Sequence, residues 1–106
     1  MQHHDLHAMI GGWFIGDFQP TAVQTSAFEV AVKRYKQGDR EAAHHHKLAE
    51  EITVIASGRV IMCGQEFGEG AIIHLARNDS TSFEALEDTI TVVVKWPSVK
   101  GDKYLD

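Results

Sequence analysis

From residue 28 onward, apolar and polar residues alternate with a period of two, which is typical of half-buried β-strands. Residues 28–35 carry the first such pattern. A β-branched run at residues 52–55 predicts another strand, because branched side chains pack well on a pleated surface. In all, the pattern predicts about seven short strands, near residues 28–35, 42–46, 52–55, 59–63, 71–75, 82–85 and 89–95.

Turn signals separate these strands. The pairs Gly38–Asp39 and Ser57–Gly58 favour tight turns, and residues 77–80 are polar and loop-like. Pro97 ends the last strand, because proline has no N–H to donate to a strand ladder. Residues 44–51 include good helix formers, but the strand pattern on both sides favours an extended conformation there. Short strands at this spacing predict an all-β sandwich or barrel.

The two ends of the chain lack this alternation. Residues 1–20 are predicted to form an irregular arm, in which glycines interrupt any long helix. The apolar cluster within residues 13–18 is expected to pack against the barrel or against a second subunit. Residues 98–106 form a polar tail without a period. A chain of 106 residues is long enough for one domain, whose core we place at about residues 28–96.

Charge and composition narrow the possible partners. The formal net charge is −5, whereas nucleic-acid-binding domains carry a basic face, so no nucleic-acid partner is expected. The basic stretch at residues 33–36 is interpreted as solvated charge at the end of a strand, and phosphate binding is the lesser alternative. No stretch approaches the ~18 apolar residues of a membrane span, and no secretion signal is recognised, so a cytoplasmic location is expected. The single cysteine, Cys63, cannot form an internal disulfide and is predicted to be half-buried on a strand.

The candidate chemistry lies between residues 38 and 58. On a strand, residues i and i+2 share a face, so His44 and His46 point the same way and His45 points the opposite way. Glu51 opens the next strand and can add a carboxylate. Two histidines and one carboxylate form the facial triad that suits Fe(II) and leaves open positions for substrate. The same ligands would also hold Mn, Ni, Co or Zn, so the sequence predicts a divalent transition metal without choosing among them.

This stretch resembles the first signature motif of the cupin superfamily. That motif is a glycine, five residues, His-x-His, three or four residues, a glutamate, six residues and a glycine, and here Gly38, His44, His46, Glu51 and Gly58 stand at those spacings. The resemblance covers roughly residues 28–96. It implies a double-stranded β-helix, or jelly-roll barrel, with a ligand cavity between its sheets. It also implies that His44, His46 and Glu51 hold the metal, and that the chain forms a homodimer.

The second cupin motif is less complete. Thr81 stands where the motif has its histidine, and a neutral hydroxyl is a poor ligand beside imidazole, so a fourth protein ligand is expected to be absent. His74 is a possible substitute, but its position between Ile73 and Leu75, which are expected in the core, would turn it away from the cavity. Glu50 is the alternative carboxylate, although its spacing to the final glycine is one residue too long.

Two functions remain open at this point. The resemblance implies a mononuclear metal-dependent enzyme of the dioxygenase, isomerase or lyase type, acting on a small polar substrate. The threonine at position 81 favours the alternative, a non-catalytic protein that binds a sugar or another small molecule in a cavity with a degenerate metal site. A structural role with a filled cavity is a third possibility.

Overall fold

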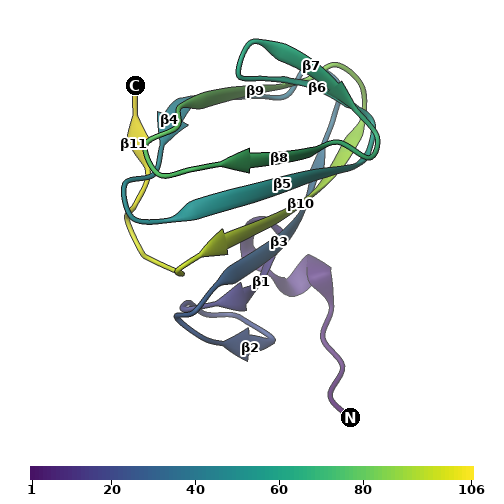
Figure 1. The fold of residues 1–106 in the computed structure, drawn as a ribbon. Coiled ribbons are helices and arrows are strands. Elements are labelled where there is room, and N and C mark those ends of the chain that lie inside the picture. The colour runs from purple at the N-terminus through teal and green to yellow at the C-terminus, as the bar shows by residue number, and fades with distance from the viewer.

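The computed structural model describes all 106 residues, which form two β-sheets that face each other (Figure 1). The first sheet contains, in spatial order, β2 (Val23–Gln24), β1 (Trp13–Gly16), β3 (Glu29–Tyr35), β10 (Thr89–Trp96), β5 (Glu50–Ser57) and β8 (Ile72–Leu75). The second sheet contains β11 (Tyr104–Leu105), β4 (Arg40–His45), β9 (Thr81–Ala85), β6 (Arg59–Met62) and β7 (Gln65–Gly68). Two short 3-10 helices, η1 (Leu6–Ala8) and η2 (Ile10–Gly12), precede β1.

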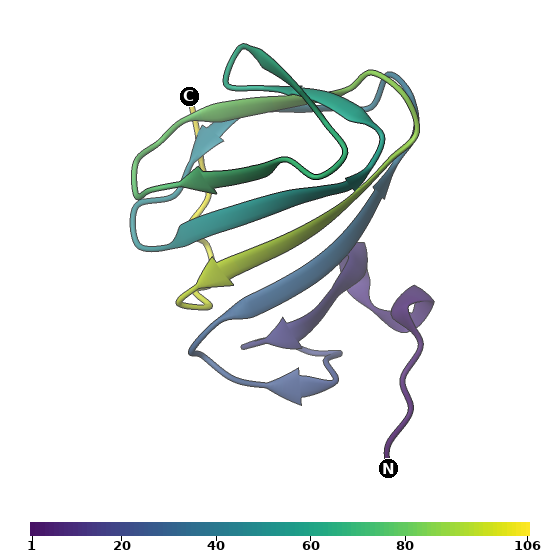
Figure 2. The same ribbon diagram turned by 45° about the vertical axis from the view of Figure 1, so that its right-hand side comes forward.

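The predicted all-β class and the seven predicted strands are confirmed. Those strands are β3, β4, β5, β6, β8, β9 and β10, and the last ends immediately before Pro97. Neighbouring strands pair antiparallel, except for β1 with β2, and both sheets curl toward each other (Figure 2). The structure adds β1, β2, β7 and β11, which have two to four residues each. Strands this short contain too few positions for an alternation to be recognised.

The hydrophobic core fills one part of the space between the sheets. It consists of seven buried side chains from β5, β6, β8 and β9, and two of them, Ile55 and Val60, are completely buried. The remaining inner surface, on β3, β4 and β10, carries mostly polar side chains. The interior is therefore divided into an apolar core and a polar region. The core residues are Ile55, Val60, Met62, Ile73, Leu75, Phe83 and Ala85.

Strand β3 shows that the more apolar face of a strand need not be the inner one. Glu29 and Ala31 are buried, and Lys33 lines the inner space with a quarter of its side chain exposed. Val32 lies on the opposite face, beneath the N-terminal arm, where it lines a groove with Leu6 and other residues of the arm. The interpretation of Lys33 as solvated charge at a strand end is wrong, because this lysine lies inside the barrel.

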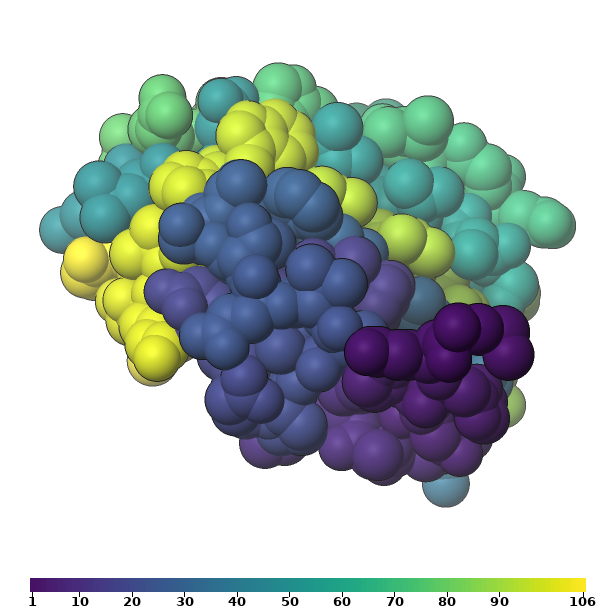
Figure 3. All heavy atoms as spheres, turned by 90° about the horizontal axis from the view of Figure 1, so that it is seen from below, coloured from purple at the N-terminus to yellow at the C-terminus, as the bar shows by residue number.

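Both chain ends contribute to the barrel. Within the segment predicted to be an irregular arm, β1 pairs with β3, and Trp13 faces the interior opposite Ala31. In the tail, Ser98 and Asp102 are buried and β11 pairs with β4. Seen from below, the segment from the N-terminus to about residue 30 covers one face, and the C-terminal tail lies along one side (Figure 3). A homodimer through residues 13–18 stays a prediction.

Cys63 differs from its prediction. It is exposed, and it follows β6 in a two-residue turn with Gly64. Both residues have a positive φ, of 54° and 70°, which is the conformation of the commonest tight hairpin turns. The turn, and not a strand pairing, therefore decides the position of the thiol. No helix in the structure combines the length and the apolar character that crossing a membrane requires.

Gly58, the last glycine of the motif, offers a stability test. Its φ is +98°, and a Cβ added there would lie 2.3 Å from Thr89 Oγ1 and 2.6 Å from the Asp88 carbonyl oxygen. Gly38 has a similar φ of +91°, but a Cβ there would meet no atom within 4 Å. We expect Gly38→Ala to lower the free energy of unfolding by about 1–2 kcal/mol through backbone strain. Gly58→Ala should cost about 1–3 kcal/mol more through the added clash.

Urea denaturation of the two variants beside the wild type measures both changes. Equal losses would mean that the close approach at Gly58 does not contribute to the requirement for glycine.

Candidate functional site

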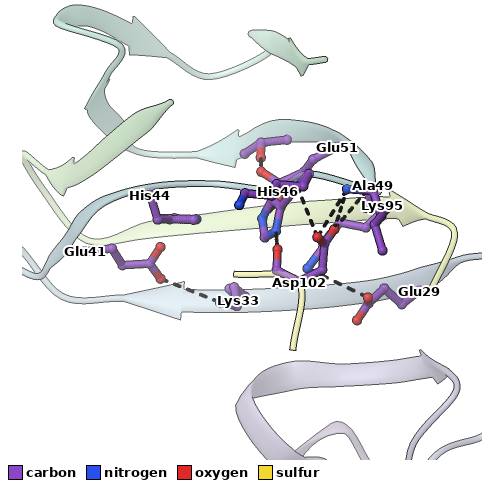
Figure 4. A network of polar contacts seen from close by, with 12 residues as sticks. Glu29, Lys33, Glu41, His44, His46, Ala49, Glu51, Lys95 and Asp102 are labelled. Carbon is purple, nitrogen blue, oxygen red and sulfur yellow. Dashed lines mark hydrogen bonds and ion pairs between the residues drawn. The ribbon is translucent and has the colours of Figure 1, made fainter. Parts of the chain in front are cut away.

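The polar part of the interior forms a cavity of about 250 Å³ between the two sheets. Of its 19 lining residues only six are hydrophobic, so most of its wall is polar or charged. Its floor is the inner face of β3, β10 and β5, and its opposite wall is formed by β4 and β9. The C-terminal tail closes one side. Figure 4 shows the charged side chains that point into it from these elements.

The structure brings the three predicted ligands His44, His46 and Glu51 to this cavity. The imidazole rings of His44 and His46 meet edge to face, with 5.4 Å between their centroids. The Nε2 atom of His46 lies 3.8 Å from Glu51 Oε1. His45 lies on the other side of β4, where its Nδ1 is 2.6 Å from Asp106 Oδ1 and its ring stacks on Tyr104.

Backbone carbonyls orient both cavity histidines. His46 Nδ1 lies 2.6 Å from the Asp102 carbonyl oxygen, and His44 Nδ1 lies 3.0 Å from the Ala42 carbonyl oxygen. A carbonyl oxygen can only accept, so Nδ1 carries the proton in each ring. The Nε2 lone pair is therefore free in each neutral ring. Histidines that bind metals show this arrangement, in which the other ring nitrogen donates to a carbonyl or carboxylate.

His46 is held in its neutral form. Burial lowers the pKa of His46, and the positive charge of Lys95 lowers it further. The Asp102 carbonyl and the Glu51 carboxylate act in the opposite direction but do not outweigh these effects. At neutral pH the Nε2 atom is therefore an unprotonated electron-pair donor, which is the form that a metal ligand or a general base requires.

Glu51 is in contact with a hydroxyl and lies beside a lysine. Its side chain is 13% exposed, and Thr53 Oγ1 donates a hydrogen bond to its Oε2 over 3.2 Å. Lys95 is its neighbour across the β5–β10 pairing and forms an ion pair with Glu29 on the other side, at 3.7 Å. Burial raises the pKa of Glu29, and the attraction of Lys95 does not cancel this effect. Glu29 is therefore a buried carboxyl that holds its proton more tightly than an ordinary glutamate.

A second lysine–glutamate pair connects the floor of the cavity on β3 with the opposite wall on β4. Lys33 Nζ is 3.6 Å from Glu41 Oε1, and the hydroxyl of Tyr35 donates to the same oxygen over 3.0 Å. Burial and the Glu41 carboxylate raise the pKa of Tyr35, which keeps its hydroxyl protonated. The Trp13 ring lies near both lysines, with its centroid 5.6 Å from Lys33 Nζ and 5.4 Å from Lys95 Nζ.

Sequence reasoning missed most of these charged residues. Lys33, which was interpreted as solvated charge, pairs with Glu41 inside the cavity. A signal was available, because the charged residues Glu29 and Lys33 lie four positions apart and therefore on one face of strand 29–35. The apolar residues between them concealed it, since they suggested that the charged face was the outer one.

Asp102 joins the C-terminal tail to the site. Its side chain accepts hydrogen bonds from the backbone N–H groups of Lys47, Leu48 and Ala49, over 2.9–3.1 Å. Burial alone would raise the pKa of Asp102, but the hydrogen bonds together outweigh burial and lower it. The same residue offers its carbonyl oxygen to His46. One buried residue thus accepts the hydrogen bonds of the turn between β4 and β5 and also orients a candidate metal ligand.

The other sequence-predicted residues lie in different places. Thr81 lines the cavity beside His44, but its hydroxyl donates to the Ser82 carbonyl over 2.6 Å and accepts from the Cys63 N–H over 3.1 Å. His74 is more than half exposed on the outer face of the first sheet, and it stacks on Trp96. Its Nε2 lies 3.0 Å from Glu50 Oε1, so these two residues contact each other outside the cavity.

The donor chemistry of the site fits a divalent metal ion. Two atoms that each lie about 2.0–2.2 Å from one ion are at most about 4.4 Å apart, and His46 Nε2 and Glu51 Oε1 are within that limit. The neutral His46 and the proton on its Nδ1 meet the requirements of a ligand. As the side chains stand, no group of three or more His, Cys, Asp or Glu side chains is close enough to hold a metal ion.

Solved structures with the same fold are numerous, although their sequences differ from this one. A conserved protein with a double-stranded β-helix domain from Klebsiella pneumoniae is 22% identical, with a TM-score of 0.70 over 76% of this chain and 71% of its own. A sugar phosphate isomerase of the cupin superfamily from Silicibacter pomeroyi is 18% identical, with a TM-score of 0.63 over 67% of this chain and 51% of its own. A DMSP lyase from Ruegeria pomeroyi is also 18% identical, with a TM-score of 0.68 over 86% of this chain and 48% of its own.

At these identities the likeness concerns the fold. No model of a protein family matches the sequence, and no curated protein matches it.

The contacts of Asp102 generate a prediction about stability. Asp102→Ala removes the acceptor of three N–H groups and should lower the free energy of unfolding by about 3 kcal/mol or more, since each buried donor without a partner costs about 1–3 kcal/mol. Asp102→Asn keeps one acceptor oxygen in place and should lose less. Chemical denaturation measures the loss, and the ¹⁵N shifts of the His46 ring report whether Nδ1 keeps its proton. An Asp102→Ala variant as stable as the wild type would contradict this role.

Proposed function

We propose that this chain, which has the fold of the cupin superfamily, binds a divalent transition metal through His44, His46 and Glu51 and acts as a metal-dependent enzyme on a small polar substrate. The observation that carries the proposal is the state of His46. Its Nδ1 is bound to the Asp102 carbonyl, its Nε2 faces Glu51 across 3.8 Å, and its ring is neutral. These are the properties of a metal ligand prepared in advance.

The motif spacing and the cavity support the same assignment. The residues that occupy the three ligand positions of the motif come from β4, from the residue after it and from β5, and all three line one cavity. Fe, Mn, Ni, Co and Zn all accept two imidazoles and a carboxylate. Such an ion, when bound, supplies a Lewis acid that polarises an oxygen atom of the substrate.

The reaction is proposed to be of the isomerase, lyase or dioxygenase type. Solved structures with this fold include a sugar phosphate isomerase and a DMSP lyase. Isomerisation and elimination both require groups that take up and release protons. Glu29, whose pKa is raised by burial, is such a group, and it lines the cavity.

The position of Thr81 favours a second candidate function. Its hydroxyl is held by two backbone partners and is a neutral oxygen, which is a poorer metal ligand than the histidine that the motif has at this position. With one ligand fewer, the cavity would serve as a non-catalytic site for a sugar or another small polar molecule. Equal binding of such a molecule by metal-free and metal-loaded protein would support this alternative.

Metal content is the direct test. The untagged full-length chain, with His3, His4 and His7 replaced by glutamine to remove adventitious ligands at the terminus, should hold about one equivalent of metal in elemental mass spectrometry. His46→Ala should lose most of it, because the variant removes an oriented ligand. His74→Ala is the matched control and should keep the metal, since His74 lies outside the cavity.

Two results would count against the proposal. One is the absence of metal in the parent protein even after reconstitution with each candidate ion. The other is an equal loss of metal in both histidine variants, which would indicate unspecific binding.

A further inference from the structure

The inner face of the first sheet has an ordered arrangement of charges. Lys95 on β10 pairs with Glu29 on β3 and with Glu51 on β5, so a lysine stands between two glutamates in one row across three strands. Two rows further along β10, Thr91 stands beside Lys33 of β3. All of these residues line the same cavity.

Both lysines have hydrogen-bond donors that no residue takes up. Lys33 Nζ and Lys95 Nζ lie 3.6 and 3.7 Å from their glutamates, which is longer than the usual 2.7–3.2 Å of a hydrogen bond. Their side chains are only 25% and 13% exposed. Each nitrogen lies within 5.6 Å of the Trp13 ring centroid, so the two nitrogens are at most 11.0 Å apart, the sum of the two distances. Both can therefore contact one small ligand.

Thr91 adds an independent observation. Its side chain is 1% exposed, and its hydroxyl is the one buried side-chain polar group in the protein without a hydrogen-bond partner. Leaving a buried hydroxyl unpaired is unfavourable, and such groups are rare in folded proteins. Its position beside Lys33 means that a single acceptor in the cavity could satisfy the hydroxyl and the ammonium group together.

The charges of the cavity favour an anion once a metal is present. Two lysines and three glutamates, Glu29, Glu41 and Glu51, leave one negative charge, and Asp102 and Lys103 cancel each other. A divalent ion at the proposed site changes this sum to one positive charge. An anionic ligand would offset this positive charge, whereas a neutral ligand would leave it unpaired, and unpaired charge is costly in a buried site.

We propose that the substrate of this cavity is a small molecule bearing an anionic oxygen group, a carboxylate or a phosphate, that is bound by Lys33, Lys95 and the hydroxyl of Thr91. This rests on the proposed function, because the metal supplies the charge that the anion balances. Lysine binds oxyanions as a point charge, and the hydroxyl of Thr91 fixes the position of one oxygen. The volume of about 250 Å³ limits the substrate to a small one.

The two tryptophans allow binding to be measured directly. Trp13 lies in the cavity and Trp96 stacks on His74 at the outer face, so Trp96→Phe leaves Trp13 as the only tryptophan. In this background, malonate is titrated against Zn(II)-loaded protein, and malonamide, its neutral counterpart of the same shape, is the control ligand. Malonate should change the Trp13 fluorescence and bind at least tenfold more tightly than malonamide. Inorganic phosphate is titrated in parallel. The anion that binds more tightly shows whether the site prefers a carboxylate or a phosphate group.

Three variants test the residues. Lys33→Met and Lys95→Met should each weaken the preferred anion at least tenfold, while Lys36→Met, an exposed lysine outside the cavity, should leave it unchanged. Thr91→Val should weaken the anion several-fold and yet raise the urea midpoint of the unliganded protein, because it removes a buried hydroxyl without a partner. A merely structural threonine would not combine weaker binding with greater stability.

The outcomes separate this inference from the proposed function. Metal content is measured in every variant. If the protein holds zinc but binds malonate, malonamide and phosphate equally, the anion site is overturned and the metal site is retained. The same conclusion follows if neither lysine substitution changes the affinity for the anion. Protein that holds no metal but still prefers an anion through Lys33 and Lys95 supports the anion site and counts against the metal.

Discussion

Charged side chains inside a barrel are stable only if each one meets an opposite charge or a hydrogen-bond partner, because desolvation of an isolated charge is very unfavourable. In this protein the antiparallel register of β3, β10 and β5 meets that condition. It places Lys95 between Glu29 and Glu51, and a separate pairing brings Lys33 to Glu41. The hydrophobic core lies on β5, β6, β8 and β9, where it does not compete with these pairs. The division of the interior into core and cavity follows from this arrangement.

The C-terminal tail completes the cavity, although it is far from the motif in sequence. Asp102 binds the turn between β4 and β5 through its carboxylate and orients His46 through its carbonyl oxygen. Because both contacts come from one residue, the folding of the tail and the orientation of the histidine are coupled. Such coupling favours binding, because the Nε2 lone pair of His46 already points into the cavity before a ligand binds.

Local patterns predicted the fold well. The alternation from residue 28 onward located seven strands, and the spacing from Gly38 to Gly58 identified three cavity residues that come from different parts of the sheets. Where the prediction was wrong, a long-range contact was responsible. The apolar Val32 indicated one inner face for β3, but the N-terminal arm covers that valine and leaves Lys33 inside. Cys63 was placed on a strand, but a hairpin turn puts it at the surface.

The sequence by itself determined which segments are strands, where the turns lie and that His44, His46 and Glu51 could share one site, because periodicity, turn chemistry and short spacings are local properties. Only the tertiary structure decided which face of each strand is inside, which carboxylate meets which lysine, that Thr91 is left without a partner and that Asp102 anchors His46. These features depend on pairings between residues distant in the chain. The free energy of burying a charge depends on these distant partners, and the local sequence does not specify them.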